Sequence, residues 1–205
     1  MAQPEHNNIG YICITSLVLG FIVGTSLVYR SRLSFYFIIV CIFHLNEFLS
    51  NCVYSQSTHH SFLIWYNRGS REYWMVQMMT MVEYMYFRRY TIGGGIVVSM
   101  IGIFLRHLSI KTLGKSFSHY IKTDKYPLVT TGIFQYIRHP SYLGFYVYVI
   151  GIEIYLRNYI SFIVCVGILT YFFRKRIQFE EYWLEKNHRE YNAYKQKVRI
   201  YIPFV

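Results

Sequence analysis

Six apolar stretches alternate with short polar segments along this chain. They cover residues 9–29, 33–54, 72–87, 90–105, 142–156 and 159–173. A helix needs roughly 20 apolar residues to cross a bilayer, a length that the first two stretches reach. The last two are shorter and are separated only by Arg157 and Asn158, so we expect a tight helical hairpin that is tilted or buried against the other helices. The pattern predicts an all-α integral membrane protein with about six transmembrane helices.

Two longer polar segments follow the fourth and the sixth stretch. Residues 111–140 are basic and rich in turn-forming residues, and loops of this length tend to be functional. Residues 174–205 form a charged tail with helical patterning and an apolar end. With six spans, this loop, the tail and both termini would share one side of the membrane.

Composition and charge predict how the protein is oriented in the membrane. Apolar residues make up 54% of the chain, and two thirds of its Lys and Arg residues lie at or beyond Lys111. Because basic residues favour the cytosolic side, we predict that the loop, the tail and both termini face the cytosol. Nucleic-acid binding is the alternative explanation of a net charge of +11, but the basic residues lie between apolar stretches and match no nucleic-acid-binding module. We therefore expect a lipid bilayer, and no nucleic acid, as a partner.

The cysteines and histidines do not predict a disulfide or a metal site. Cys13, Cys41, Cys52 and Cys165 show no CxxC spacing, and each lies in or beside an apolar stretch, which indicates small buried hydrophobic residues. His59-His60 could bind a metal. A histidine pair with no cysteine or carboxylate nearby is more typical of a solvated turn.

Three carboxylates, Glu47, Glu83 and Glu153, fall inside the apolar stretches. Charged groups within a membrane are costly and often functional. Pairing with a nearby arginine, or a position at the membrane interface, explains them equally well, and the sequence leaves these alternatives open.

The segment before the fifth stretch is the most informative. It reads LVTTGIFQYIRHPSY over residues 128–142. Thr131-Gly132 indicates a turn, and Pro140 suits the first turn of the following helix, where its missing N–H costs nothing. The free N–H groups of that turn could hold an anion such as a cofactor carboxylate. A juxtamembrane anchor with an arginine, a histidine and a tyrosine at the interface is the alternative interpretation.

A second group of charged residues follows the sixth stretch directly. In the run RKRIQFEE, residues 174–181, Arg176 and Glu180 are four residues apart and share one face of a helix. Taken alone, the run is also typical of a stop signal on the cytosolic side that is followed by a solvated ion pair.

Taken together, the two motifs resemble the signature of the isoprenylcysteine carboxyl methyltransferase family. The first matches as LVTxGxFxxxRHPSY and the second as RxxxEE. The segment SFSH at 116–119 is similar to the family's loop, and EYNAYK at 190–195 with IPF at 202–204 is similar to its C-terminus. Shared motifs carry the resemblance over about residues 90–205. The first 90 residues resemble the family only in the pattern of their apolar stretches.

This resemblance implies an enzyme of the endoplasmic reticulum membrane that uses S-adenosylmethionine to methylate the C-terminal carboxylate of prenylated, proteolysed CaaX proteins. It divides the chain into N-terminal transmembrane helices, 1–90, and a catalytic region, 91–205, whose loop 111–140 and tail 174–205 form the cofactor pocket. Arg176 would contact the substrate, and Arg176 and Glu180 would be the catalytic residues. Cofactor contacts would fall on Lys122, Tyr126, Pro127, Leu128, Val129, Phe134, His139, Pro140, Ser141, Tyr142 and Glu180.

Three other functions stay open at this point. A phospholipid N-methyltransferase that acts on phosphatidylethanolamine is also a small membrane protein with a similar C-terminal pattern. A sterol-reductase-like enzyme and a non-enzymatic membrane scaffold or small transporter come from other classes. Cofactor binding would separate the methyltransferases from the last two, and the identity of the acceptor would separate the two methyltransferases.

Overall fold

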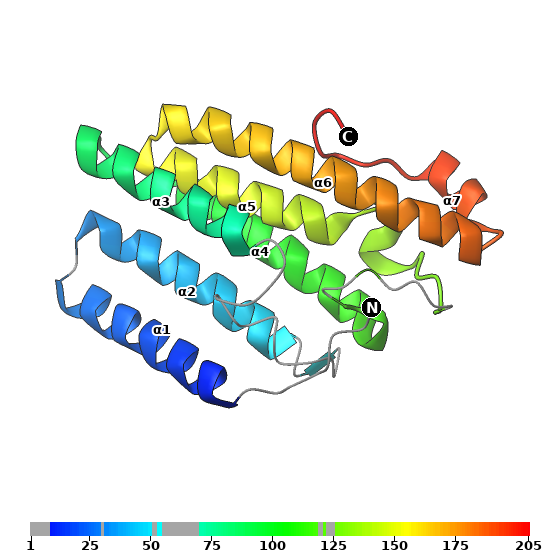
Figure 1. Ribbon diagram of the computed structural model, residues 1–205, viewed down its shortest axis with the longest axis horizontal. Helices are drawn as coiled ribbons and strands as arrows, with labels where there is room; N and C mark the ends of the chain where they lie inside the picture. Colours follow the sequence, from blue (N-terminus) through cyan, green and yellow to red (C-terminus); the bar gives the residue numbers. More distant parts are fainter. Residues whose placement is uncertain (1–8, 30, 51–52, 55–69, 119–120, 122–125) are drawn as a thin grey trace.

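The computed structural model describes residues 9–29, 31–50, 53–54, 70–118, 121 and 126–205, which form a bundle of long helices (Figure 1). The α-helices are α1 (Ile9–Tyr29), α2 (Arg32–Ser50), α3 (Ser70–Phe87), α4 (Gly94–Leu113), α5 (Pro140–Leu156), α6 (Tyr159–Asn187) and α7 (Tyr191–Lys197). Two 3-10 helices, η3 (Gly114–Ser116) and η4 (Gly132–Gln135), lie between α4 and α5. Within the described residues the only β pairing is one bridge between Ile137 and Arg199. The predicted all-α class is confirmed.

The helices follow the predicted apolar stretches closely, with two differences. α5 ends at Leu156 and α6 begins at Tyr159, which confirms the helical hairpin. α4 continues to Leu113, beyond its predicted end at residue 105. α6 does not end at residue 173 but runs for 29 residues to Asn187. Neither proline nor glycine interrupts residues 168–187, so the charged run continues the helix of the last apolar stretch.

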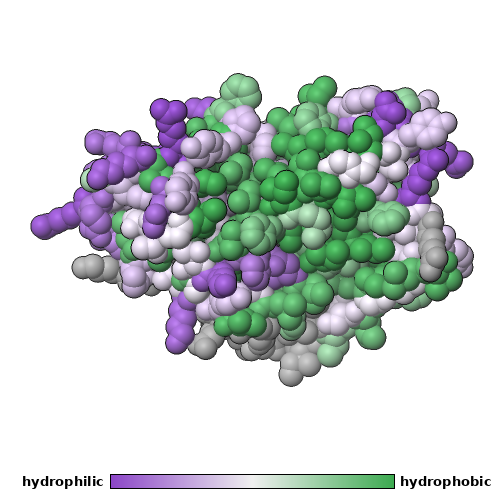
Figure 2. All heavy atoms as spheres, turned by 180° about the vertical axis from the view of Figure 1, so that it is seen from behind, coloured by the Kyte–Doolittle hydropathy of each residue, from purple (hydrophilic) through white to green (hydrophobic). Residues whose placement is uncertain are grey.

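The outer surface of the bundle is apolar. Leu17 and Phe21 of α1 are each 73% exposed. Figure 2 shows a broad hydrophobic surface across the middle of one face, interrupted by one hydrophilic group, with most other hydrophilic residues towards the ends. A surface of this kind is typical of contact with lipid. By length and composition, Arg32–Ser50 and Gly94–Ser116 could cross a membrane, whereas the apolar segments Cys13–Tyr29 and Pro140–Leu156 are shorter. The number of six spans therefore stays a prediction.

The cysteines differ from the expectation at one position. Cys41 and Cys165 are buried, but Cys13 is exposed, because α1 packs on α2 and turns its other face outward. Cys52 and the pair His59-His60 lie outside the described residues. In the described part of the chain, no three His, Cys, Asp or Glu side chains gather as potential metal ligands.

Glycines bring α4 and α5 into backbone contact. Gly95 and Gly102 of α4 face Gly151 and Gly144 of α5. A Cβ atom on Gly102 would lie 2.6 Å from the carbonyl oxygen of Gly144, and one on Gly144 would lie 2.7 Å from the backbone nitrogen of Arg106. Any side chain at these positions would push the helices apart. α5 is therefore held on α4 along much of its length (Figure 1).

The three carboxylates of the apolar stretches all have partners in the fold. Both oxygens of Glu47 on α2 accept hydrogen bonds from Arg106 on α4. Glu83 near the end of α3 lies 2.9 Å from the guanidinium of Arg89. Glu153 on α5 accepts a hydrogen bond from a threonine on α3. Two of the three therefore pair with arginine, which was one of the alternatives that the sequence left open.

The tail returns to the segment that precedes α5. After α7, residues 198–205 run back along α6 (Figure 1), and Ile202 is buried in the core cluster that also contains Phe173 and Ile177. The backbone nitrogen of Arg138 donates to the carbonyl oxygen of Arg199 at 3.1 Å, beside the single β bridge. The loop and the tail therefore meet at one end of the bundle.

Candidate active site

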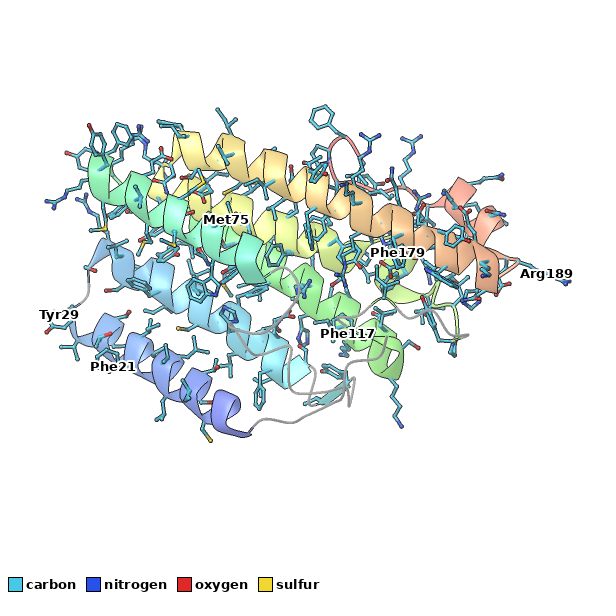
Figure 3. The ribbon with its side chains drawn as sticks, viewed as in Figure 1. Phe21, Tyr29, Met75, Phe117, Phe179 and Arg189 are labelled. Atoms are coloured by element: carbon cyan, nitrogen blue, oxygen red, sulfur yellow. The ribbon has the colours of Figure 1, made fainter. Side chains whose placement is uncertain are left out.

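A cleft lies at the end of the bundle where the loop and the tail meet. The space within it, counted together with the open solvent at its mouth, is ≈ 580 Å³. The end of α4, the loop, the first turn of α5 and the charged part of α6 form its wall; Figure 3 labels Phe117 on the α4 side. The lining residues are Leu113, Ser116, Phe117, Ser118, Ile121, Tyr126, Phe134, His139, Pro140, Ser141, Tyr142, Arg176 and Glu180.

The first turn of α5 forms one side of the cleft. His139 is the N-cap residue and Pro140 begins the helix, because proline lacks an N–H and its φ suits the first helical position. Ser141 and Tyr142 follow in the cleft wall. The N–H groups of a first helical turn have no acceptor within their own helix, so this turn can bind an anionic ligand group.

Tyr142 connects the two residues that the sequence predicted as catalytic. Its hydroxyl donates to Glu180 Oε2 at 2.6 Å and accepts from Arg176 Nε at 2.9 Å. The guanidinium carbon of Arg176 also lies 5.5 Å from the centre of the Tyr142 ring. Arg176 and Glu180 are therefore oriented from α5, in addition to sharing one face of α6. The sequence did not indicate this role of Tyr142, which it predicted only as a cofactor contact.

His139 joins this group to a second carboxylate. Its ring stacks on Tyr142 with 5.6 Å between centres, its Nε2 lies 3.0 Å from Glu181 Oε1, and its Nδ1 lies 3.8 Å from Glu180 Oε2. Glu181 also pairs with Lys195 at 2.8 Å. Burial acts to raise the pKa of Glu181, but hydrogen bonds from His139 and Lys195 outweigh it and hold that pKa at about 2. The carboxylate stays ionised over the whole neutral range.

The Glu181 group also fixes the tail, and sequence reasoning missed it. Arg138 Nε lies 3.0 Å from Glu181, while Arg138 Nη1 donates to the carbonyl oxygens of Lys195 at 2.8 Å and Val198 at 3.2 Å. The sequence contained a signal, because both Arg138 and the second glutamate of the Glu-Glu pair stand inside the recognised motifs. Neither lines the cleft, so they position its walls.

The structure brings together most of the residues predicted for the site. Tyr126, Phe134, His139, Pro140, Ser141, Tyr142, Arg176 and Glu180 all line the cleft. Pro127, Leu128 and Val129 do not; Pro127 is exposed and the other two are half-buried beside the cleft. Lys122 lies outside the described residues. Phe117 and the serines on either side of it line the cleft although they were not predicted, and the similarity of SFSH to a family loop was the available signal.

The electrostatics of the cleft combine a cation, an anion and neutral aromatic hydroxyls. Arg176 and Glu180 supply the two charges. Burial, and secondly the charge of Glu180, raise the pKa of Tyr126 to about 12, so this phenol remains a hydrogen-bond donor at neutral pH. Such a cleft can hold a carboxylate at the arginine and a cationic group near the glutamate.

Comparisons with protein families, with individual proteins and with solved structures all indicate the same family. The isoprenylcysteine carboxyl methyltransferase family model matches residues 95–186. The protein-S-isoprenylcysteine O-methyltransferase of Saccharomyces cerevisiae is 29% identical over 224 residues, covering 98% of this chain and 94% of the relative. The B form of that enzyme in Arabidopsis thaliana is 33% identical over 185 residues, covering 82% and 91%. The structure of a eukaryotic intramembrane Ras methyltransferase superposes with a TM-score of 0.84 at 27% identity, covering 95% and 77%.

Proposed function

The chain belongs to the isoprenylcysteine carboxyl methyltransferase family, and we propose that it transfers a methyl group from S-adenosylmethionine to the C-terminal carboxylate of an isoprenylated cysteine. Its protein partners are then the prenylated C-termini of CaaX-processed proteins, and its location is the endoplasmic reticulum membrane. The names of the relatives support this acceptor, and the fold shared with an intramembrane methyltransferase supports a location within a membrane.

The observation that carries the proposal is an arginine between a polar cleft and an apolar cavity. The cavity lies between α3, α5 and α6, with walls that include Phe145 and Leu169. The Tyr142 ring, which lines the cleft, stacks on Phe173 at 5.2 Å, and Phe173 contacts Phe145 at 6.0 Å. A series of three aromatic rings, Tyr142, Phe173 and Phe145, therefore leads from Arg176 to the wall of the apolar cavity. A prenylated cysteine combines the two chemistries that these adjoining sites fit, a carboxylate and a long apolar chain.

The cleft also fits S-adenosylmethionine by the chemistry of its side chains. Glu180 and the aromatic faces of Tyr126 and Phe134 suit a cationic ligand group. Ser141 and the first turn of α5 suit a carboxylate. When bound, the cofactor would supply an electrophilic methyl group.

The residues of the cleft have to position the acceptor rather than activate it. A C-terminal carboxyl has a pKa of about 3.5, so it is ionised at neutral pH and needs no general base. Arg176 can bind a carboxylate through its planar fork, and its bond to Tyr142 fixes the plane of the guanidinium. The buried aromatic rings around Phe173 should exclude water from the apolar side. Orientation and removal of water are the two contributions that such a displacement requires.

Methyl transfer by the purified protein tests the proposal directly. We would incubate it with labelled S-adenosylmethionine and either a farnesylcysteine analogue or phosphatidylethanolamine. We expect methyl ester from the first acceptor and no product from the second. Single-turnover rates should be level between about pH 7 and pH 9, because the acceptor carboxylate is already ionised.

Two results would contradict the proposal. Methylated lipid, formed at a rate that rises about tenfold per pH unit as the amine loses its proton, would identify a phospholipid N-methyltransferase. Absence of cofactor binding in a folded preparation would point to a function outside the methyltransferases. Calorimetric titration with the cofactor distinguishes a protein that does not bind the cofactor from one that binds it but does not methylate the acceptors offered.

A further inference from the structure

Arg106, a largely buried arginine next to the cleft, has all three of its side-chain nitrogens hydrogen-bonded to protein. Arg106 on α4 donates through Nε and Nη2 to the two oxygens of Glu47 on α2, the second at 2.8 Å. The side chains of Arg106 and Glu47 are only 11% and 3% exposed. The guanidinium carbon also lies 5.8 Å from the Phe43 ring centre and 5.7 Å from that of Phe145. Two hydrogen bonds and two rings fix the plane of this guanidinium.

The remaining nitrogen of Arg106 reaches the cleft wall. Its Nη1 donates to Ser141 Oγ at 3.1 Å and to the Ser141 carbonyl oxygen at 3.3 Å. Ser141 and its neighbour Tyr142 both line the cleft. Beside these bonds, α4 and α5 are closely packed at Gly144. A Cβ there would lie 2.7 Å from the backbone nitrogen of Arg106. The first turn of α5 is therefore attached to α2 and α4 through one guanidinium.

The attachment continues to the predicted catalytic residues. Tyr142 bonds Arg176 at 2.9 Å and Glu180 at 2.6 Å. A continuous series of contacts thus runs from Glu47 through Arg106 and the first turn of α5 to α6. A shift of Ser141 would move Tyr142 and, with it, the orientation of Arg176.

We propose that Glu47 and Arg106 form a positioning pair that holds the first turn of α5 so that Tyr142 keeps Arg176 in line for methyl transfer. This inference rests on the proposed function for its reaction. The pair acts through Ser141 and Tyr142 and does not itself touch the reactants. Displacement of a reacting group by about 1 Å can lower a rate by about a hundredfold.

A second, partly buried ion pair in the same chain provides a control. Glu83 and Arg89 lie 2.9 Å apart, and Glu83 also accepts from the backbone nitrogen of Ser161 at 2.6 Å, at the hairpin end of α6. The hairpin is the end of α6 opposite to Arg176 and the cleft. Loss of this pair should destabilise the fold without moving the cleft.

The experiment compares Glu47→Gln and Arg106→Lys with Glu83→Gln in the purified full chain. We expect single-turnover rates at saturating reactants to fall about 30- to 100-fold in the first two, while each KM changes less than about threefold. Glu83→Gln should lower the thermal midpoint but keep the rate per folded molecule within about twofold of wild type. A rate within twofold of wild type in folded Glu47→Gln or Arg106→Lys would overturn the inference, as would an equal rate loss in Glu83→Gln.

Ser141→Ala keeps the inference testable if the ion-pair variants do not fold. Removing the Oγ acceptor should lower the rate about five- to tenfold in the otherwise unchanged chain. Where Arg106→Lys does fold, Ser141→Ala should have little further effect in it, because the two residues act through one contact. An unchanged rate in Ser141→Ala, or full additivity in the double variant, would overturn it. If wild type methylates neither acceptor, the proposed function fails before any variant is compared.

Discussion

Helices α1 and α4 both carry glycines at regular spacing, but they use them differently. Gly20 and Gly24 of α1 are four residues apart, and a Cβ on either would meet nothing within 4 Å. Gly95 and Gly102 of α4 are seven residues apart, and a Cβ on either would lie 2.6 Å from a carbonyl oxygen of α5. One set of glycines lies at an open surface, whereas the other lies where two backbones touch.

The difference follows from what each helix supports. α5 begins at the cleft, and its first turn has to stay fixed relative to α4 and α6 for the site to keep its geometry. α1 packs on α2 and exposes Leu17 and Phe21. A methyl group added on the outer face of α1 would therefore contact no other part of the protein. Glycine spacing alone does not distinguish these two situations; the neighbouring helix does.

The largest effect is expected from one methyl group at the α4–α5 contact. Gly102→Ala would place a Cβ 2.6 Å from the Gly144 carbonyl oxygen. Separation of the helices should lower the free energy of unfolding by about 3 kcal/mol, the upper end of the usual cost of overpacking, which is well above the gain of about 1 kcal/mol that alanine has over glycine within a helix. Thermal unfolding in detergent, followed by circular dichroism, measures the change. An unaltered midpoint would show that the two backbones are not in contact.

Ionic contacts of Glu181 also stabilise the end of the bundle where the cleft lies. Glu181→Gln tests their contribution. The substitution should cost roughly 2 kcal/mol at pH 7, because each pKa unit is worth about 1.4 kcal/mol and the pair is partly screened. The folded-state pKa of about 2 lies below the ordinary 4.5, so the stabilisation is complete above that ordinary value and is lost as the pH falls through about 2. The stability difference from wild type should therefore be constant above about pH 5.5 and shrink below it. If the stability difference between Glu181→Gln and wild type did not depend on pH, the ionic contacts of Glu181 would not stabilise the fold.

Arg176→Lys separates the geometry of the site from its charge. A point charge cannot replace the planar fork, so we expect activity with the farnesylcysteine analogue to fall about a hundredfold. Cofactor affinity should change less than about threefold. The exposed Arg174 on the same helix provides the control, since Arg174→Lys should keep full turnover. Full activity of folded Arg176→Lys would remove this residue from the site.

Cofactor affinity should depend on the residues around Tyr142. Glu180→Gln removes the charge that accepts from Tyr142, and His139→Ala removes the ring stacked on it. We expect each to weaken cofactor binding about tenfold, or 1.4 kcal/mol, measured by calorimetric titration. Glu185→Gln, about one turn further along α6 at an exposed position, is the control. Unchanged affinity in both site variants would place the cofactor elsewhere.

The sequence predicted the parts of the site that depend on local structure. The spacing of Arg176 and Glu180 on one helix face, the proline at the start of α5 and the hairpin at Arg157 all follow from residues within a few positions of one another. The resemblance to a family then supplied roles for the residues that turned out to line the cleft.

The parts that the sequence did not predict depend on partners far along the chain. The bond of Arg106 to Ser141 joins helices 35 positions apart, and the pair of Arg138 with Lys195 joins segments 57 positions apart. The contact of Gly102 with α5 likewise requires knowledge of which helix lies opposite. Periodicity gives the face of a helix but not its neighbour, so these contacts became visible only in the fold.

The smallest effect is expected on the other side of the comparison, at α1. Alanine is preferred to glycine inside a helix by about 1 kcal/mol, and Gly20→Ala and Gly24→Ala each place their methyl group in open space. The thermal midpoint of either variant should therefore equal or slightly exceed that of wild type, and the rate of methyl transfer should not change. The same substitution, glycine to alanine within a helix, would then have opposite consequences at Gly20 and Gly102. A clear loss of stability or activity in the α1 variants would show that this helix also presses its glycines against a neighbour, and the contrast between the two surfaces would no longer hold.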